Sequence, residues 1–264
     1  MLMNEPIDQE LSEFFEKKKK LLREKGNYSF KKLEEAFHQR TSGRYLGDVI
    51  FGANDGLVTT FAVVAGAAGA GLSATVMLVL GFANLVADGL SMGLGNYLGK
   101  KSEGDYSKGQ RQKEAWEIEH LRPVEVAEVR GIFTKYGFKG ADLERSVDIV
   151  TADKKAWVDF MMLEELGIIE EGESAPARHG VATFFAFALS GFAPLIPFVL
   201  GLSVSQGLPW SIMLTAVAMF TSGAFRARIT PRRWWRAGIE MLLIGTIAAG
   251  AAYVVGAILE PLLK

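Results

Sequence analysis

The sequence predicts an all-α integral membrane protein with five transmembrane helices and a cytoplasmic three-helix insert between helices two and three. Hydrophobic residues make up 49% of the 264 residues, 29 residues are glycine, and the mean hydropathy is positive at +0.18. The apolar residues are clustered into stretches that approach the roughly 20 residues an α-helix needs to cross a bilayer. Between the second and third stretches the composition changes abruptly to charged and polar.

Five stretches are predicted to span the membrane: residues 46–71, 72–98, 181–203, 209–225 and 238–259. They divide the chain into an amino-terminal arm (1–41), a first pair of spans (42–99), the insert (100–178) and a second group of spans (179–264). The opening segment "MLMNEPIDQELSEFFEKKKKLLREKG" has no apolar core, so it is not a cleavable signal sequence and the first span must direct insertion. The absence of cysteine excludes disulfides and thiolate metal sites.

The distribution of Lys and Arg predicts the orientation, because short cytoplasmic loops carry an excess of both. The loop "RARITPRRWWRAG" and the "KKKK" run with Arg40 and Arg44 are therefore predicted to be cytoplasmic. The connections "AGAAGAGLSA" and "SVSQGLP" contain neither residue and are predicted to lie outside. This topology places the amino terminus and the insert in the cytoplasm and Lys264 outside.

The arm is predicted to be an amphipathic helix on the cytoplasmic membrane surface or against the insert. Leu11, Phe14, Phe15 and Leu22 fall near one face, with lysines around them. A solvated coil is an equally good interpretation of residues 1–10.

The insert is predicted to contain three helices. The first covers 102–120, and the second begins at Pro123 and ends near Gly137, since proline favours a first helical turn and glycine a helix end. The third runs from about 140 to Gly167, with Thr151 as the point where the pattern allows a break. Residues 170–177 are predicted to be a linker.

A set of carboxylates and thioethers in the insert predicts a metal site. Glutamates three residues apart share a helix face, so each E-x-x-E pair can present two carboxylates to one cation. Carboxylates combined with methionine suit iron or manganese better than calcium or magnesium. The candidate ligands are Glu114, Glu117, Glu125, Glu128, Met161, Met162 and Glu165.

Two other interpretations of these residues remain open. Exposed helices are commonly rich in glutamate without binding any metal. Glu117 and His120 also form an E-x-x-H pair, which is half of the di-iron signature of ferritin-like bundles, but a second such pair is missing.

Polar residues inside the first two spans predict a path for cations. Asp48 and Asp55 lie on one stripe of the first span, and Asn84, Asp88 and Met92 lie on one stripe of the second. At about 1.5 Å per residue, Asp55 is about 13 Å and Met92 about 10 Å from the cytoplasmic ends of their spans, so they can lie side by side. An ionised aspartate at mid-membrane costs about 2.5–3.5 kcal/mol, which favours a pathway or a counter-charge.

The alternative is a structural role in hydrogen bonding between helices. Asp88 is the strongest candidate for such a role, because Ser91 and Asn96 are close enough in sequence to bond to it. Elsewhere in the spans, Pro194 and Pro197 are predicted to kink the third helix in mid-membrane. Small-residue patterns that allow close helix contact occur at Gly89-xxx-Gly93 and Gly95-xxx-Gly99.

Several long motifs give the sequence a resemblance to a known family. They are "GDVIFGANDGLVTTFAVVAGAAGAG", "ANLVADGLSMGLGNYLGKKSEGD", "RPVEVAEVRGIFTKYGF" and "WVDFMMLEELG". In this order, and together with the "PLIPF" and "AAGAAY" regions, they resemble the vacuolar iron transporter family from about Arg40 to the carboxyl terminus. That family has five spans and a cytoplasmic helical insert after the second.

The resemblance implies export of Fe2+ from the cytosol in exchange for protons, by a homodimer whose ion route runs at the subunit interface. It implies that Asp55 and Met92 are membrane ligands, and it assigns metal binding in the insert to the seven candidates given above. Ile168 stands where the family has a further glutamate, for which Glu164 or Glu170 could substitute. Asn84 stands where plant relatives have a membrane glutamate, so proton coupling would depend on Asp48 or Asp88.

The leading hypothesis is a secondary transporter, not an enzyme, that moves Fe2+ or Mn2+, with Zn2+ and Co2+ accepted by the same ligand types. No prosthetic group and no nucleic-acid partner are expected. The membrane would be the inner cell membrane in a prokaryote and the vacuolar membrane in a eukaryote. The rival hypotheses are a membrane-anchored metal sensor or buffer and a membrane ferroxidase.

Overall fold

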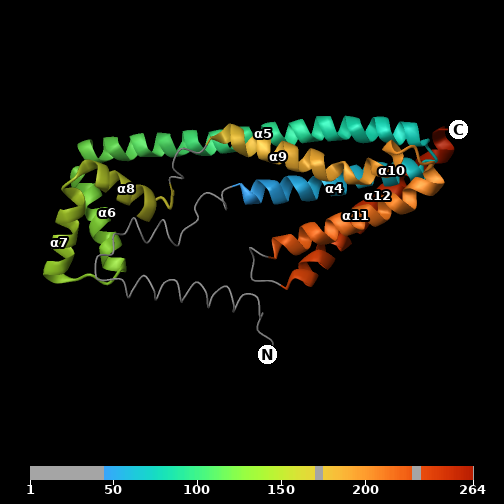
Figure 1. Ribbon diagram of the computed structural model, residues 1–264. Coiled ribbons are helices and arrows are strands. Elements are labelled where there is room, and N and C mark those ends of the chain that lie inside the picture. Colours follow the sequence, from blue (N-terminus) through green and yellow to red (C-terminus); the bar gives the residue numbers. More distant parts are fainter. Residues whose placement is uncertain (1–44, 170–174, 228–232, 264) are drawn as a thin grey trace, which may run out of the picture. The chain divides into compact units, whose positions relative to one another are not determined.

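The computed structural model describes residues 45–169, 175–227 and 233–263, and the regular secondary structure of these ranges is entirely helical. Five of its helices have the length and apolar composition needed to cross a membrane, as predicted. The arm at 1–41, with Leu11, Phe14, Phe15 and Leu22, lies outside the described residues, as does part of the basic loop before the fifth span. Figure 1 shows the helices with their labels.

The spans are formed by α4 (Leu46–Gly69), the first half of α5 (Ala74–His120), α9 (Pro176–Gly191) with its continuation, α11 (Val204–Arg226) and α12 (Trp234–Leu263). The third span begins five residues before the predicted position 181, with Pro176 in its first turn. The fourth was predicted to begin at Pro209, which is wrong: Pro209 lies inside α11. A proline this close to a helix start removes only one backbone hydrogen bond, so the helix tolerates it.

The helix α5 does not end at the membrane boundary. It continues without a break from Ala74 to His120, so the helix predicted at 102–120 is the second half of the second span's own helix (Figure 1). The connecting stretch "GKKSEGDYSKGQRQKE" contains no proline, and its Lys, Glu, Gln and Arg residues are good helix formers. One continuous helix therefore joins the membrane spans to the insert.

The rest of the insert consists of α6 (Arg122–Lys135), α7 (Gly140–Thr151) and α8 (Lys154–Glu164). The predicted third helix is thus two helices, and the break falls at Thr151. Asp153 begins α8 by accepting a hydrogen bond from the Ala156 backbone N–H at 2.8 Å. A single apolar core joins these helices to the end of α5; its buried members are Ile118, Val129, Ile132, Val147, Trp157, Val158, Met161 and Met162.

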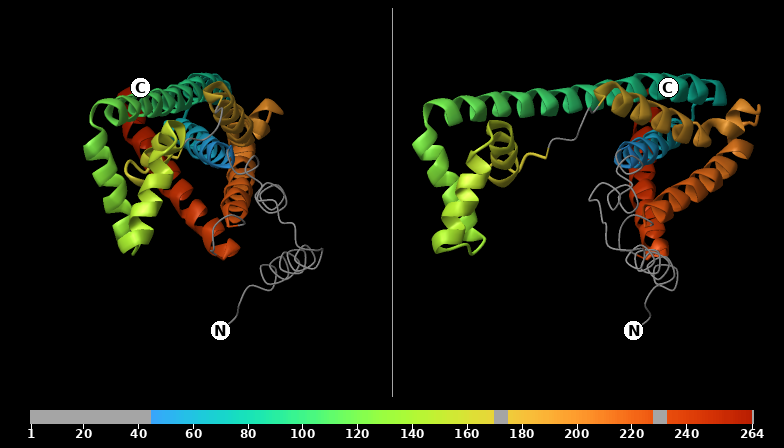
Figure 2. Two further views of the ribbon diagram at one scale, coloured as in Figure 1. Left: turned by 90° about the vertical axis from the view of Figure 1, so that its left-hand side faces the viewer. Right: turned by 60° about the vertical axis from the view of Figure 1, so that its left-hand side comes forward.

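Glycines let α9 pack closely against both α4 and α5 (Figure 2). A Cβ atom on Gly180 of α9 would lie 2.4 Å from the carbonyl oxygen of Gly93 on α5, and one on Gly56 of α4 would lie 2.3 Å from the carbonyl oxygen of Phe187. The Gly89–Gly93 pattern is therefore part of a helix contact. A Cβ atom on Gly95 or Gly99 would meet no atom of the described residues within 4 Å.

The third span is interrupted near its end. A 3-10 turn, η1 (Ala193–Leu195), and a short helix, α10 (Ile196–Val199), follow α9. The prediction of a break at the prolines is confirmed, but its location in mid-membrane is wrong, because the span begins at Pro176 and the prolines fall in its last turns. The side-chain hydroxyl of Ser211 on α11 donates to the carbonyl oxygen of Pro194 at 2.7 Å, so a neighbouring helix satisfies this buried group.

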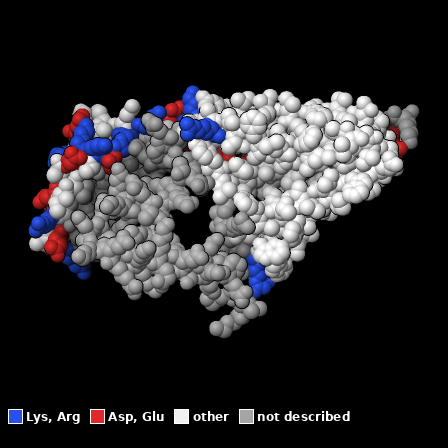
Figure 3. All heavy atoms as spheres, viewed as in Figure 1, with Lys and Arg blue, Asp and Glu red and all other residues white. Residues whose placement is uncertain are grey.

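Charged side chains are unevenly distributed between the insert and the spans. In Figure 3, Lys, Arg, Asp and Glu gather over the end of the described chain that contains α6, α7 and α8, whereas the visible surface of the spans is almost free of them. Many large apolar side chains on the spans are exposed, including Leu90, Leu94 and Leu98 on α5. Such a surface requires lipid or another protein subunit to cover it.

Candidate functional site

Three carboxylates from three helical segments meet in the insert. Glu114 of α5, Glu125 of α6 and Glu165, directly after α8, each offer an oxygen, and these oxygens lie within 4.8 Å of one another. Glu114 is 2% exposed and Glu125 is 4% exposed, whereas Glu165 is exposed. We call these three residues the carboxylate cluster; it is buried on two sides and reaches solvent at Glu165.

The carboxylate cluster brings buried acidic groups close together. The Oε2 atoms of Glu114 and Glu125 are buried and have no hydrogen-bond partner among the described residues. Burial, assisted by the charges of Glu165 and Glu117, raises the pKa of Glu114 to about 7. Burial, assisted by Glu128, raises the pKa of Glu125 to about 7. The cluster is therefore suited to hold either protons or a multivalent cation.

Only the first glutamate of each E-x-x-E pair belongs to the carboxylate cluster. Glu117 and Glu128 are close enough to raise the pKa of Glu125 but are not members of the three-oxygen group. Glu117 forms an ion pair with Lys113 at 3.2 Å. The second glutamate of each pair, Glu117 or Glu128, therefore lies beside the cluster and is not one of its members.

The two candidate thioethers lie in the core of the insert. Met161 is fully buried and Met162 is 2% exposed, and both pack with Trp157 and Val158. That Met161 and Met162 bind a metal ion remains a prediction.

Other candidates in the insert are engaged elsewhere. Ile168 packs against the apolar core, so this position adds no ligand. Glu164 accepts a hydrogen bond from the Tyr136 hydroxyl. The ring of His120 stacks on Trp116, with centroids 4.4 Å apart, and its Nδ1 is 2.8 Å from the Trp116 carbonyl oxygen. Glu117 and His120 therefore do not join the carboxylate cluster as an E-x-x-H pair.

The polar residues of the first two spans face each other. Asn96 of α5 donates to Asp48 Oδ1 at 2.8 Å, and Asn84 donates to Thr59 at 3.5 Å and to Thr60 at 3.4 Å. These contacts join the antiparallel helices α4 and α5 at two levels and so determine their register. We call the stretch of the α4–α5 contact between these two levels the polar path.

The register places Asp55 at the level of Gly89. Asp88 is thus its immediate neighbour across the helix pair, and the two carboxylates interact electrostatically. Met92 lies roughly 4–5 Å further toward the insert, at 1.5 Å per residue, and packs against an apolar cluster that includes Leu85 and Phe187. Asp55, Asp88 and Met92 are all half-buried.

The expectation that Asn96 satisfies Asp88 is wrong. Asn96 lies two turns further toward the insert and donates to Asp48 and, at 2.7 Å, to Thr183. Asp88 forms no hydrogen bond or ion pair within the described ranges. Its carboxylate therefore remains available to a cation or a proton.

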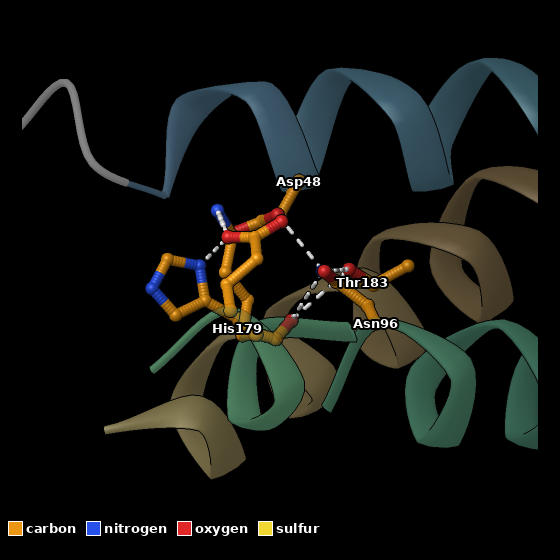
Figure 4. Close-up of polar contacts among 6 residues, drawn as sticks. Asp48, Asn96, His179 and Thr183 are labelled. Atoms are coloured by element: carbon orange, nitrogen blue, oxygen red, sulfur yellow. Dashed lines mark hydrogen bonds and ion pairs between the residues drawn. The ribbon is translucent and has the colours of Figure 1, made fainter. Parts of the chain in front are cut away.

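A third helix completes the insert-side end of this path (Figure 4). His179 of α9 is 1% exposed, and its Nδ1 lies 2.6 Å from Asp48 Oδ2. Asp48, Asn96, His179 and Thr183 thus connect α4, α5 and α9. Sequence reasoning missed His179 by treating it as the boundary of the insert; the signal was a buried aspartate that required a partner.

Comparisons with known proteins agree on one family. Residues 46–257 match the profile of the VIT family. Similar proteins include the vacuolar iron transporter of Toxoplasma gondii, 35% identical over 84% of this chain and 77% of that protein. Vacuolar iron transporter 1 of Arabidopsis thaliana is 33% identical over 83% of this chain and 88% of its own length. The vacuolar iron transporter of Plasmodium berghei is 30% identical over 86% of each chain.

Proposed function

This chain belongs to the VIT family, and we propose that it carries Fe2+, with Mn2+ as a second substrate, out of the cytosol across a membrane in exchange for protons. The observation that carries this proposal is the combination of a buried carboxylate cluster in the insert with half-buried aspartates between the spans. A protein whose spans only anchor the insert would not need aspartates between them, because ionised aspartates are costly to insert into a membrane.

The carboxylate cluster would collect the ion. Oxygen ligands from Glu114, Glu125 and Glu165 suit a divalent cation, and Glu117 and Glu128 add negative charge beside them. Because burial raises the pKa of Glu114 and of Glu125 to about 7, binding near neutral pH would release protons. Met161 and Met162 would favour iron over calcium if their sulfur atoms reach the ion.

The polar path would then carry the ion through the membrane. Asp55 and Asp88 supply two carboxylates at nearly one level, and Met92 supplies a thioether nearer the insert. This donor set also suits Fe2+ and Mn2+, and Zn2+ and Co2+ would compete for it. Protons would replace the ion on the aspartates for the return step.

A homodimer would enclose this path. Asp55, Asp88 and Met92 are only half-buried in the single chain, and the exposed apolar side chains of α5 surround them. A second copy covering this surface would shield the carboxylates from lipid. By the distribution of basic residues, the insert would face the cytoplasm, in the inner cell membrane of a prokaryote or the vacuolar membrane of a eukaryote.

The experiment is metal flux in proteoliposomes that contain the purified full-length protein. Uptake of Fe2+ or Mn2+ would be followed by quenching of a trapped chelating dye, with a second dye reporting internal pH. We expect Asp55→Ala to abolish flux, and Thr221→Val to preserve it, since Thr221 is exposed and bonds only to carbonyls of its own helix. Wild-type flux in Asp55→Ala would refute the proposed path.

A membrane-anchored metal sensor or buffer is the second candidate, favoured by the location of the carboxylate cluster outside the spans. The same liposomes separate the two functions: a buffer binds metal with the affinity of the cluster but shows no flux in any variant. A membrane ferroxidase is the third candidate, and it would show oxygen-dependent oxidation of bound Fe2+ in the same liposomes.

A further inference from the structure

His179 lies at the meeting point of three helices. Its Nδ1 is 2.6 Å from Asp48 Oδ2, and the other oxygen of Asp48 accepts a hydrogen bond from Asn96 at 2.8 Å. The Asp48 side chain is 13% exposed, and that of His179 is 1% exposed. The contact is therefore nearly closed to solvent, and Figure 4 shows it at the insert-side end of the polar path, where α4, α5 and α9 meet.

The hydrogen bonds around His179 favour a proton on its Nδ1 atom. Thr183 donates its hydroxyl to the His179 carbonyl oxygen at 3.0 Å, so it accepts from the Asn96 amide. Asn96 uses its other N–H on Asp48 Oδ1, so this oxygen is an acceptor. With Asp48 as an ionised carboxylate, His179 donates from Nδ1 to Oδ2 and holds a lone pair on Nε2.

That lone pair is buried and has no hydrogen-bond partner among the described residues. A buried nitrogen without a partner is costly in either protonation state, but the positive charge that a proton on Nε2 adds would be balanced by the adjacent Asp48 carboxylate. Tyr45, before α4, places its ring 4.6 Å from that of His179. The titratable groups of α5 nearest this end are Tyr97 and Lys100, and Lys100 forms an ion pair with Glu103 at 2.9 Å. Asp48 is therefore the direct counter-charge.

We propose that Nε2 of His179 is a proton-binding site of the exchange cycle, with Asp48 as the residue that positions the imidazole. The proposal rests on the proposed function. Nε2 takes a proton from water, forming an N–H bond, and returns it to water when the bond breaks, so no further reactant is needed. Histidine suits this role because its charge changes between pH 5 and 8.

The position of His179 explains how a proton and a metal ion would exclude each other. Asp48 precedes Asp55 by seven residues on α4, about 10 Å along the helix. A positive charge on the imidazole repels a divalent cation at Asp55, and this repulsion is weakly screened between the spans. Binding of a proton at His179 therefore favours release of the metal ion from Asp55, and binding of the metal ion favours release of the proton. Exchange of the two requires this coupling.

The first test is the pH dependence of transport in proteoliposomes. In His179→Asn the amide nitrogen can replace Nδ1 as the donor to Asp48, but the side chain cannot take up a proton. We expect this variant to show a weaker dependence of Mn2+ uptake on pH between about 5 and 8 than the wild type, and the part that remains should come from Glu114 and Glu125. The matched control is His120→Asn, which makes the same change at an exposed histidine of the insert and should retain the wild-type profile. A wild-type profile in His179→Asn overturns the proposal.

The second test does not require transport. The chain has three histidines, so His38→Asn combined with His120→Asn leaves His179 as the only imidazole for nitrogen NMR in lipid nanodiscs. We expect Nε2 to take up a proton between about pH 5 and 8 while Nδ1 remains protonated. An imidazole that does not titrate in this range overturns the proposal, even if His179→Asn fails to fold. Titration without metal flux would reject the proposed function but would support the proton-binding site.

Discussion

Glu114 and Glu125 bring two buried carboxylates together from α5 and α6, and neither Oε2 atom has a hydrogen-bond partner among the described residues. Buried carboxylates without partners destabilise a fold unless a proton or a cation neutralises them. We therefore expect the carboxylate cluster to link proton binding to metal binding in the insert, independently of the path in the membrane. This link should be measurable both in metal affinity and in the stability of the metal-free protein.

Metal affinity of the insert should increase as pH increases from 6 to 8. The pKa of Glu114 and that of Glu125 are raised to about 7, chiefly by burial, so protons compete with the metal below pH 7 and leave above it. Calorimetric titration of the full-length protein with Mn2+, in two buffers of different ionisation enthalpy, would report the protons released. Affinity and proton release that do not change with pH would contradict the assignment of these carboxylates.

The stability of the metal-free protein should change in the opposite direction. Because the folded-state pKa of Glu114 and of Glu125 is about 7, above the ordinary value of 4.5, the folded state binds more protons between these values. Stability is therefore highest below about pH 4.5 and falls as pH increases through 7. We expect a loss on the order of 2–4 kcal/mol for the pair, about half of what the two pKa differences would give in full, because the cluster is open to solvent at Glu165. Thermal unfolding followed by tryptophan fluorescence would measure this, and Mn2+ should restore the loss at pH 8.

Glu125→Gln supplies the corresponding variant test. It removes one titrating carboxylate, so the metal-free protein should lose part of its pH dependence and Mn2+ should no longer restore stability at pH 8. Glu119→Gln is the matched control, because Glu119 is an exposed residue paired with Lys154. If both variants behave alike, the effect does not come from the carboxylate cluster.

The existence of the spans was predictable, but some of their ends were not. Hydropathy alone identifies five apolar stretches, because the bilayer imposes a minimum length. It does not show that α5 continues to His120, since a helix can leave the membrane without any signal when the next residues favour helix. The break at Thr151 was predictable in position because Asp153 can cap a new helix.

The candidate site was predictable by residue type more than by geometry. The E-x-x-E spacing indicated Glu114 and Glu125, but which member of each pair turns inward depends on how α5, α6 and α8 pack. His179 was missed because its partner, Asp48, is distant in sequence, and only the packing of α9 against α4 brings them together. Asn96 was expected to form a hydrogen bond with Asp88 because the two residues are close in sequence. It instead donates to Asp48 of α4 and Thr183 of α9.

Asp88→Asn should weaken transport almost as much as Asp55→Asn. The register of α4 and α5 places the two carboxylates at nearly one level, so each variant removes one charged oxygen ligand from the same place. A loss of about 1.4 kcal/mol of binding free energy weakens affinity about tenfold. We therefore expect the concentration of Mn2+ at half-maximal uptake to increase at least about tenfold. Thr221→Val again provides the control, and wild-type uptake in Asp88→Asn would assign Asp88 to a structural role.

Gly180→Ala should destabilise the bundle by separating α9 from α5. Its Cβ would lie 2.4 Å from the Gly93 carbonyl oxygen and 3.1 Å from the Tyr97 Cβ, so the backbone itself would have to move. Overpacking of this kind usually costs about 1–3 kcal/mol, and it would also stretch the contact between Asn96 and Thr183. Gly95→Ala is the matched control, because no atom lies within 4 Å of its Cβ position and alanine favours helix by about 1 kcal/mol. Thermal unfolding in nanodiscs should therefore show a lower midpoint for the first variant and an equal or higher one for the second; equal midpoints would show that the close approach at Gly93 is not required for stability.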